Sequence, residues 1–284
     1  MKLCVSKLIA GILGAATVFL AQGSAATPVW QLNPQGTGAS GAVSLSQVDV
    51  GGAGFVQIIP STTDPTSYQF VENGAYQLLS PGTGTAFSGN DLTVSYSVSG
   101  SGSFLNPLAL QFTSGTISLY ADANYDFAST AGNYGADNGT LIALFNIFAG
   151  GVDSSTGLVT VTAALETGSL LAGYFFSADG TDLATTTGTT IELSIYNQLT
   201  TPDSLIVSEI ICGLAGYVGA GCDGTSSTFS NSPLTFAVRD GGFASVIANV
   251  PEPGTILLVL AGLLVIACLT RGSRRLPAIT AHAA

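Results

Sequence analysis

The chain has 284 residues, with 17 Asp and Glu against 6 Lys and Arg, and one histidine. Five of the six basic residues lie near the two ends, so residues 27–249 hold 16 acids and the single base Arg239, a net charge of −15. This balance excludes nucleic-acid binding, because neutralising phosphates requires clustered Lys and Arg. It also leaves no base for Ser–His–Asp or Cys–His catalysis in this region, since the only histidine is His282. The acidity is explained either by solubility through self-repulsion or by attraction for divalent cations.

The first predicted element is a secretory signal peptide over residues 1–26. Lys2 and Lys7 form its basic start, Leu8 to Leu20 its apolar segment, and Ser24–Ala26 a cleavage site of small residues. The mature chain then begins at Thr27. A retained N-terminal membrane helix is the alternative, and it would leave the location of the following domain unchanged.

Residues 27–249 are predicted to form one exported, acidic, all-β domain. Short runs rich in β-branched and aromatic residues alternate with Gly, Asn, Asp and Pro, and in several runs every second residue is apolar. This pattern predicts a β-sandwich, with a jelly roll as one option. The expected strands cover residues 54–60, 67–72, 92–98, 116–120, 141–148, 158–162, 190–196, 205–211 and 234–239.

Oxygen-bearing side chains at alternate positions make Asp122, Asn124 and Asp126 the best candidate for a cation site. They follow a predicted strand and open like an EF-hand calcium loop, for which carboxylate and amide oxygens are the expected ligands. The pattern then departs from an EF-hand, because Phe127 stands where Gly is required and Asn133 where Glu is required. Two interpretations remain, a calcium site of another kind and an exposed acidic loop without metal.

Carbohydrate chemistry has two sets of candidate residues. A glycosidase needs only two carboxylates, but the four glutamates of the domain lie in or beside predicted strands, where polar side chains normally face solvent; they are Glu72, Glu166, Glu192 and Glu209. A flat sugar-binding surface could use aromatic rings, although core packing is the alternative explanation for most of them; these are Trp30, Tyr68, Tyr76, Tyr96, Tyr120, Tyr125 and Tyr134. We therefore expect a protein that is not an enzyme.

Cys212 and Cys222 are expected to form a disulfide. The other two cysteines, Cys4 and Cys268, lie in the terminal segments, and an exported domain is in an oxidising compartment. Metal binding by this pair is disfavoured, because the domain has no histidine and no third thiol to complete a tetrahedral site.

The C-terminal region has three parts. Val250, Pro251, Glu252 and Pro253 are followed by an uncharged apolar run over residues 254–270. A helix of this run would be roughly 25 Å long, close to the thickness of a bilayer core. The basic cluster that follows would hold its end on the cytoplasmic side; it consists of Arg271, Arg274 and Arg275.

Residues 250–275 resemble the PEP-CTERM sorting signal of Gram-negative bacteria, in which the same three parts occur in the same order. The resemblance implies an exosortase as partner, a membrane anchor before processing, and a role in cells that produce exopolysaccharide. Nine further residues, 276–284, follow the arginines, whereas proteins of this family usually end there.

The domain itself is similar to flocculation-associated PEP-CTERM proteins, at segments that include residues 69–76, 115–122, 141–145, 166–170 and 233–236 and at the late cysteine pair. These resemblances imply an exported protein of the cell surface or extracellular matrix, with a structural or adhesive role in biofilm or floc formation. A carbohydrate- or calcium-dependent binding module is the alternative.

Overall fold

The computed structural model describes residues 29–153, 156–224 and 228–248. Internal contacts divide the chain into two units, Met1–Ala248 and Asn249–Ala284, and every described residue belongs to the first. The expected signal peptide, sorting motif, apolar run and basic cluster lie outside the described residues and stay predictions. Within the described ranges, no helix combines the length and the apolar character needed to cross a membrane.

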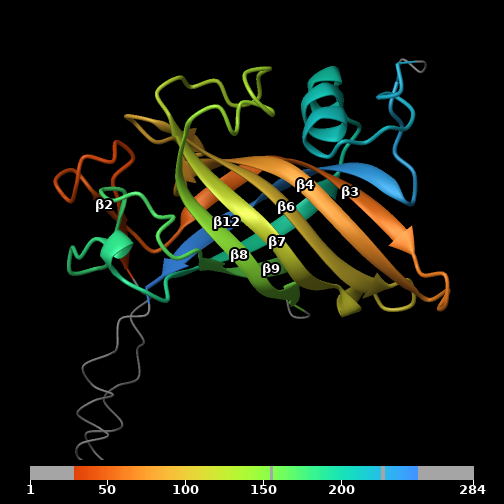
Figure 1. Cartoon of the computed structure of the whole chain (residues 1–284), viewed down its shortest axis with the longest axis horizontal. Helices are drawn as coiled ribbons and strands as arrows, with labels where there is room; N and C mark the ends of the chain where they lie inside the picture. The colour runs from red at the N-terminus through yellow and green to blue at the C-terminus, as the bar shows by residue number, and fades with distance from the viewer. Residues whose placement is uncertain (1–28, 154–155, 225–227, 249–284) are drawn as a thin grey trace, which may run out of the picture. The chain divides into compact units, whose positions relative to one another are not determined.

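Strands dominate this unit, and the expectation of an all-β fold is confirmed (Figure 1). The strands are β1 (Trp30–Leu32), β2 (Val43–Leu45), β3 (Val48–Pro60), β4 (Ser67–Ser80), β5 (Thr85–Ala86), β6 (Asp91–Ser103), β7 (Gln111–Asp122), β8 (Thr140–Val152), β9 (Val159–Leu165), β10 (Phe175–Phe176), β11 (Thr190–Leu199) and β12 (Thr235–Ile247). The described ranges also contain three helical segments: η1 (Pro107–Ala109), η2 (Leu183–Thr185) and η3 (Ile206–Leu214).

The main sheet closes on itself, so the expected sandwich or jelly roll is wrong. Its order is β3-β12-β11-β9-β8-β7-β6-β4-β5, and β3 also pairs with β4. Eight long strands, each antiparallel to its neighbours, therefore form a closed barrel, with the short β5 attached to β4. Alternating apolar residues define which side of a strand is buried, but they do not tell whether the buried side faces a second sheet or the inside of the same sheet.

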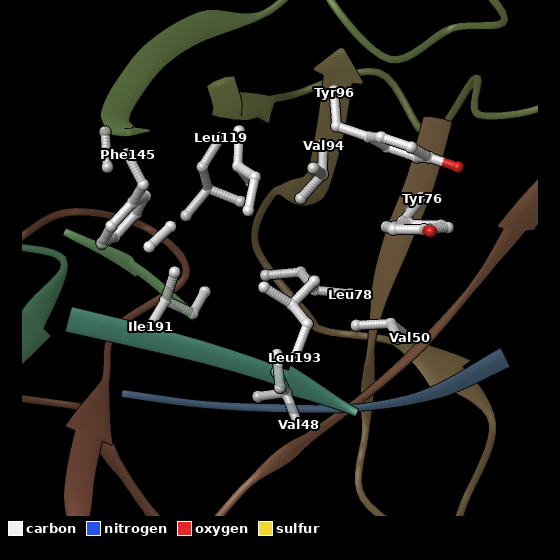
Figure 2. Packing of buried hydrophobic residues seen from close by; sticks show 14 of the residues in the cluster. Val48, Val50, Tyr76, Leu78, Val94, Tyr96, Leu119, Phe145, Ile191 and Leu193 are labelled. Carbon is white, nitrogen blue, oxygen red and sulfur yellow. The ribbon is translucent and has the colours of Figure 1, made fainter. Parts of the chain in front are cut away.

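The barrel interior holds the main hydrophobic core. Figure 2 shows part of it, with side chains from several strands converging on one another, among them Leu78, Val94, Phe145 and Leu193. The second, three-stranded sheet, in the order β10-β1-β2, contributes to the same core through the buried Trp30, whose ring stacks on Phe175 at 5.7 Å. This sheet lies at the end of the barrel where β3 begins and β12 ends.

Where a strand over residues 205–211 was expected, the chain forms helix η3 (Ile206–Leu214). Asp203 lies just before the helix and caps its start, since its Oδ1 accepts hydrogen bonds from the backbone N–H groups of Leu205 (3.0 Å) and Ile206 (2.9 Å). The helix is of the π type, and the N–H of Ala215 donates to the carbonyl of Ile210, five residues earlier, at 2.9 Å.

Tertiary packing explains why this segment forms a helix although its β-branched residues favour strands. Ile206, Ile210 and Ile211 are fully buried and belong to a second core cluster on the outer wall of the barrel. The wall contributes outward-facing residues of β3, β4 and β12 to this cluster; these are Ala53, Phe55, Ala75 and Ala237. The small alanines let the helix approach the sheet closely.

The disulfide between Cys212 and Cys222 is present, as expected. It joins the end of η3 to the following loop, in which Tyr217 lies edge-on to Phe55 with ring centroids 5.3 Å apart. Phe229 packs on the same ring at 5.5 Å. The bond therefore holds together the segment that covers the second core cluster.

Replacing both cysteines by serine (Cys212→Ser with Cys222→Ser) should lower the free energy of unfolding by about 2–3 kcal/mol, because the unfolded chain regains the freedom of a short loop. Urea denaturation of the full chain measures this difference. The wild-type chain kept under reducing conditions is the matched control and should behave like the double variant. Equal stability of the oxidised and reduced wild-type chains would contradict the prediction.

Candidate ligand-binding site in the barrel

The barrel contains a cavity at the end opposite the small sheet. This cavity has a volume of about 290 Å³ and is lined by apolar side chains from the ends of the strands, among them Val56, Phe70, Phe112 and Phe236. A smaller cavity of about 30 Å³ lies further inside. The two cavities are adjacent, since four residues line both: Glu72, Phe112, Val159 and Asn197. An apolar space inside a barrel with few polar groups is the usual form of a small-molecule site.

A buried pair of carboxyl groups lies beside the inner cavity. The hydroxyl of Tyr96 on β6 is 3.0 Å from Oε1 of Glu72 on β4 and 3.1 Å from Oδ2 of Asp240 on β12. Glu72 and Asp240 are each 6% exposed. The ring of Tyr76 stacks on that of Tyr96 with centroids 4.6 Å apart, and Figure 2 shows their hydroxyl oxygens on the same side.

Two glycines make this arrangement possible. A Cβ atom on Gly54 of β3 would lie 2.5 Å from the hydroxyl oxygen of Tyr96, and one on Gly74 of β4 would lie 2.4 Å from it. Contacts this short do not occur between real atoms, so any larger residue would push the tyrosine away from its carboxyl partners. The barrel wall is therefore shaped around the hydroxyl group of Tyr96.

Burial changes the acidity of both carboxyl groups. Desolvation, followed by repulsion from Asp240, raises the pKa of Glu72 to about 8, and the hydrogen bond from Tyr96 acts in the opposite direction. Desolvation also raises the pKa of Asp240 to about 7, against the hydrogen bonds with Tyr96 and Tyr76. The one base of the domain, Arg239, is 54% exposed and pairs with Asp203 at 3.4 Å, so it does not offset the buried charges.

The hydrogen bonds of the pair point to a shared proton. A hydroxyl group has one hydrogen to donate, yet the hydroxyl of Tyr96 has two carboxyl oxygens within hydrogen-bond distance. A proton on one carboxyl group satisfies both contacts. The other oxygen of Asp240, Oδ1, is buried and has no hydrogen-bond partner among the described residues.

Sequence reasoning missed this site. Glu72 was expected to face solvent, and this is wrong, because it lies on the same side of β4 as Phe70 and Tyr76 and points into the barrel. Asp240 likewise shares its side of β12 with Val238. In both strands the acid occupies a position where the alternation requires an apolar residue, and this was the signal that could have found it.

The structure places the proposed calcium residues at the barrel end near the small sheet. Asp122 ends β7 directly opposite Asp91, and its Oδ1 accepts hydrogen bonds from the backbone and side-chain N–H groups of Asn124. Asp126 accepts one from Asn138 at 3.1 Å. Burial raises the pKa of Asp91, with smaller contributions from repulsion by Asp126 and Asp122.

One carboxylate oxygen of each of these three aspartates is buried without a hydrogen-bond partner in the described part of the chain; the residues are Asp91, Asp122 and Asp126. Nevertheless, across the described ranges no three or more His, Cys, Asp and Glu side chains are grouped closely enough to hold a metal ion. The calcium site therefore stays a prediction.

The carbohydrate candidates are separated by the fold. Among the four glutamates only Glu72 is buried, and the other three are exposed or half-buried. Among the seven aromatic residues, Trp30, Tyr76, Tyr96 and Tyr134 are buried in the cores. Tyr68 lies half-buried at the outer cavity, where its ring is 4.7 Å from that of Phe104.

No family model, curated protein or solved structure matches this chain.

Replacing Glu72 by glutamine should weaken the dependence of stability on pH. Because folding raises the pKa of Glu72 from 4.5 to about 8 and that of Asp240 from 3.8 to about 7, the folded state binds extra protons between these values. The free energy of unfolding of the wild-type chain should therefore fall as pH rises from about 4 to about 8. The fall per pH unit is at most about 1.4 kcal/mol for each extra proton that the folded state binds. Urea denaturation at several pH values should show a smaller slope for Glu72→Gln.

The matched control for this variant is Glu192→Gln. Glu192 lies on β11 between the inward-facing Ile191 and Leu193, so the same chemical change occurs on the outer face. It should keep the wild-type slope. A Glu72→Gln chain with an unchanged slope would contradict the burial of this carboxyl group.

Gly54→Ala should destabilise the barrel by about 1–3 kcal/mol, because the added methyl group overlaps the Tyr96 hydroxyl and crowds both carboxyl groups. Gly51→Ala on the same strand is the control, since the atom nearest to its Cβ is Cδ1 of Leu79 at 3.7 Å. Chemical denaturation of both variants measures the difference. Equal stability of the two would mean that the wall does not need glycine beside Tyr96.

Proposed function

We propose that this chain is an exported binding protein of the cell envelope, whose barrel holds a small, mainly apolar molecule with one polar group. The observation that carries this proposal is the apolar cavity at one end of the barrel, which continues to the carboxyl group of Glu72. The walls would hold the apolar part of the ligand, and the buried acid would fix its orientation.

The energetic cost of Glu72 supports a role in binding. Burying a carboxyl group in an apolar interior costs free energy that an apolar side chain of similar size would not. The chain nevertheless carries two such groups inside one barrel and two glycines that make room for the tyrosine between them. Titratable groups with strongly shifted pKa values beside a cavity are candidates for functional residues.

Binding fits this site better than glycoside hydrolysis. In a glycosidase the two carboxyl groups stand on either side of the sugar bond. Here the hydroxyl of Tyr96 occupies the space between Glu72 and Asp240, within 3.1 Å of an oxygen of each. A substrate bond has no place there, and we therefore propose that the protein is not an enzyme.

The proposed location rests on the sequence. The signal peptide, the motif over residues 250–253, the apolar run over residues 254–270 and the three following arginines support export, a single-pass membrane anchor and processing by an exosortase. The resemblance to flocculation-associated proteins supports a place at the cell surface or in the matrix, in contact with exopolysaccharide. The structural or adhesive role remains a proposal on the same grounds, and small-molecule binding in the barrel is compatible with it.

Binding of n-hexanol, a neutral molecule with a short apolar chain, tests the cavity. The wild-type full chain should bind one equivalent with a Kd of roughly 0.1–1 mM, as expected for a ligand of this size. Val159→Trp should weaken binding, because Val159 lines both cavities and an indole ring would occupy the space next to Glu72. Isothermal titration calorimetry measures the affinity.

The control variant is Thr160→Trp, at the next residue of β9 and on the opposite face of the strand. It should bind n-hexanol like the wild-type chain. The proposal is overturned if the wild-type chain binds no n-hexanol, or if Val159→Trp binds it unchanged.

A further inference from the structure

The interior of the barrel has acids but no bases. Glu72 lines both cavities, Asp240 is joined to it through the hydroxyl of Tyr96, and among the described residues no Lys, Arg or His lines either cavity. The sequence explains this lack, since Arg239 is the only base between residues 27 and 249 and its side chain lies outside with Asp203. A negative site without a counter-charge of its own is suited to a positively charged ligand.

The polar side chains that line the inner cavity are Glu72, Tyr76, Tyr96 and Asn197, so its donors are two hydroxyl groups and one amide. A carboxylate accepts hydrogen bonds and does not donate them, and the single hydroxyl proton of Tyr96 can serve only one of the two carboxyl oxygens within its reach. Oδ1 of Asp240 adds a buried acceptor with no partner in the described part of the chain. A ligand that supplies several N–H donors would satisfy these acceptors.

Taking the proposed binding function as its premise, we infer that the ligand of the barrel is an organic amine, bound as its ammonium ion. The N–H groups of the ammonium donate to the carboxyl group of Glu72, and its apolar part occupies the outer cavity between Val56, Phe70 and Phe236. An ammonium group has three donors and one positive charge, which matches an acidic site rich in acceptors.

Protons and charge balance in this step. Before binding, Glu72, Asp240 and Tyr96 share one carboxyl proton. When the ammonium ion enters, that proton leaves to solvent, so one positive charge replaces another and both carboxyl groups become ionised. A ligand that ends in a carboxylate would instead bring a third negative group to the pair, and the barrel should reject it.

Three six-carbon probes that differ only in the head group test this inference on the full chain: n-hexylammonium, n-hexanol and n-hexanoate. All three titrations use the same medium, which keeps the full chain in solution, and a titration without protein is subtracted from each. At pH 8 the ammonium should bind at least about tenfold more tightly than the alcohol, which is the gain typical of a charge-assisted hydrogen bond, and hexanoate should not bind. The affinity for the ammonium should rise with pH between about 6 and 8, whereas that for the alcohol should stay constant.

Variants separate recognition of the head group from folding. Glu72→Gln should weaken ammonium binding by at least about tenfold and leave the alcohol affinity within about twofold, because the cavity itself is unchanged. Asp240→Asn should act in the same direction, and it provides a second test if Glu72→Gln fails to fold. Glu192→Gln, the same change on the outer face, should alter neither affinity.

Calorimetry in two buffers with different ionisation enthalpies detects the released proton. Near pH 7 the ammonium should release up to one proton per bound ligand, and the alcohol none. An ammonium that binds no more tightly than the alcohol overturns this inference but leaves the proposed function standing. If none of the three probes binds, the proposed function and this inference both fail. If Glu72→Gln and Glu192→Gln lose the same affinity for the ammonium, the ammonium is not attracted to this site, and the inference is overturned.

Discussion

The pairing of β3 with β12 is the constraint on which the rest of the molecule depends. Ten residue pairs, from Thr235 with Gln57 to Ala244 with Val48, join the first long strand to the last. This ladder removes the two open edges of the sheet and gives every long strand an inner and an outer face. The inner face creates the cavities and buries Glu72, whereas the outer face offers the wall on which η3 packs.

The candidate site contains residues that are unfavourable inside strands. Glycine in a strand interior lowers its stability, yet Gly54 and Gly74 stand side by side in neighbouring strands and face Tyr96. Buried acids are unfavourable as well. Such departures from local rules are typical of residues that serve recognition rather than folding. The stacked rings of Tyr76 and Tyr96 offset part of this cost through packing.

Local patterns in the sequence predicted most strands. The features that they did not predict depend on contacts between residues far apart in the sequence. Eight of the nine expected runs overlap long strands, because alternation and β-branched residues act within a few positions. The run at 205–211 is equally rich in β-branched residues, but Asp203 caps it as a helix, and the helix packs against alanines of the outer wall. Closure of the sheet joins residues far apart in sequence, and no alternation pattern encodes it. The alternation of apolar residues already places Glu72 on the buried side of its strand, and closure of the barrel decides that this side faces a cavity.

The ladder between the first and last long strands also affects the order of events in folding. Its partners are about 190 residues apart, and contacts at such a separation form late because they require a large loss of chain entropy. Seven strands can pair in succession as neighbouring hairpins. They remain an open, curved sheet with unpaired edge strands until the eighth strand pairs with them. A chain halted before residue 235 would expose that edge to other copies, which makes the completion of β12 the step that protects this protein from aggregation.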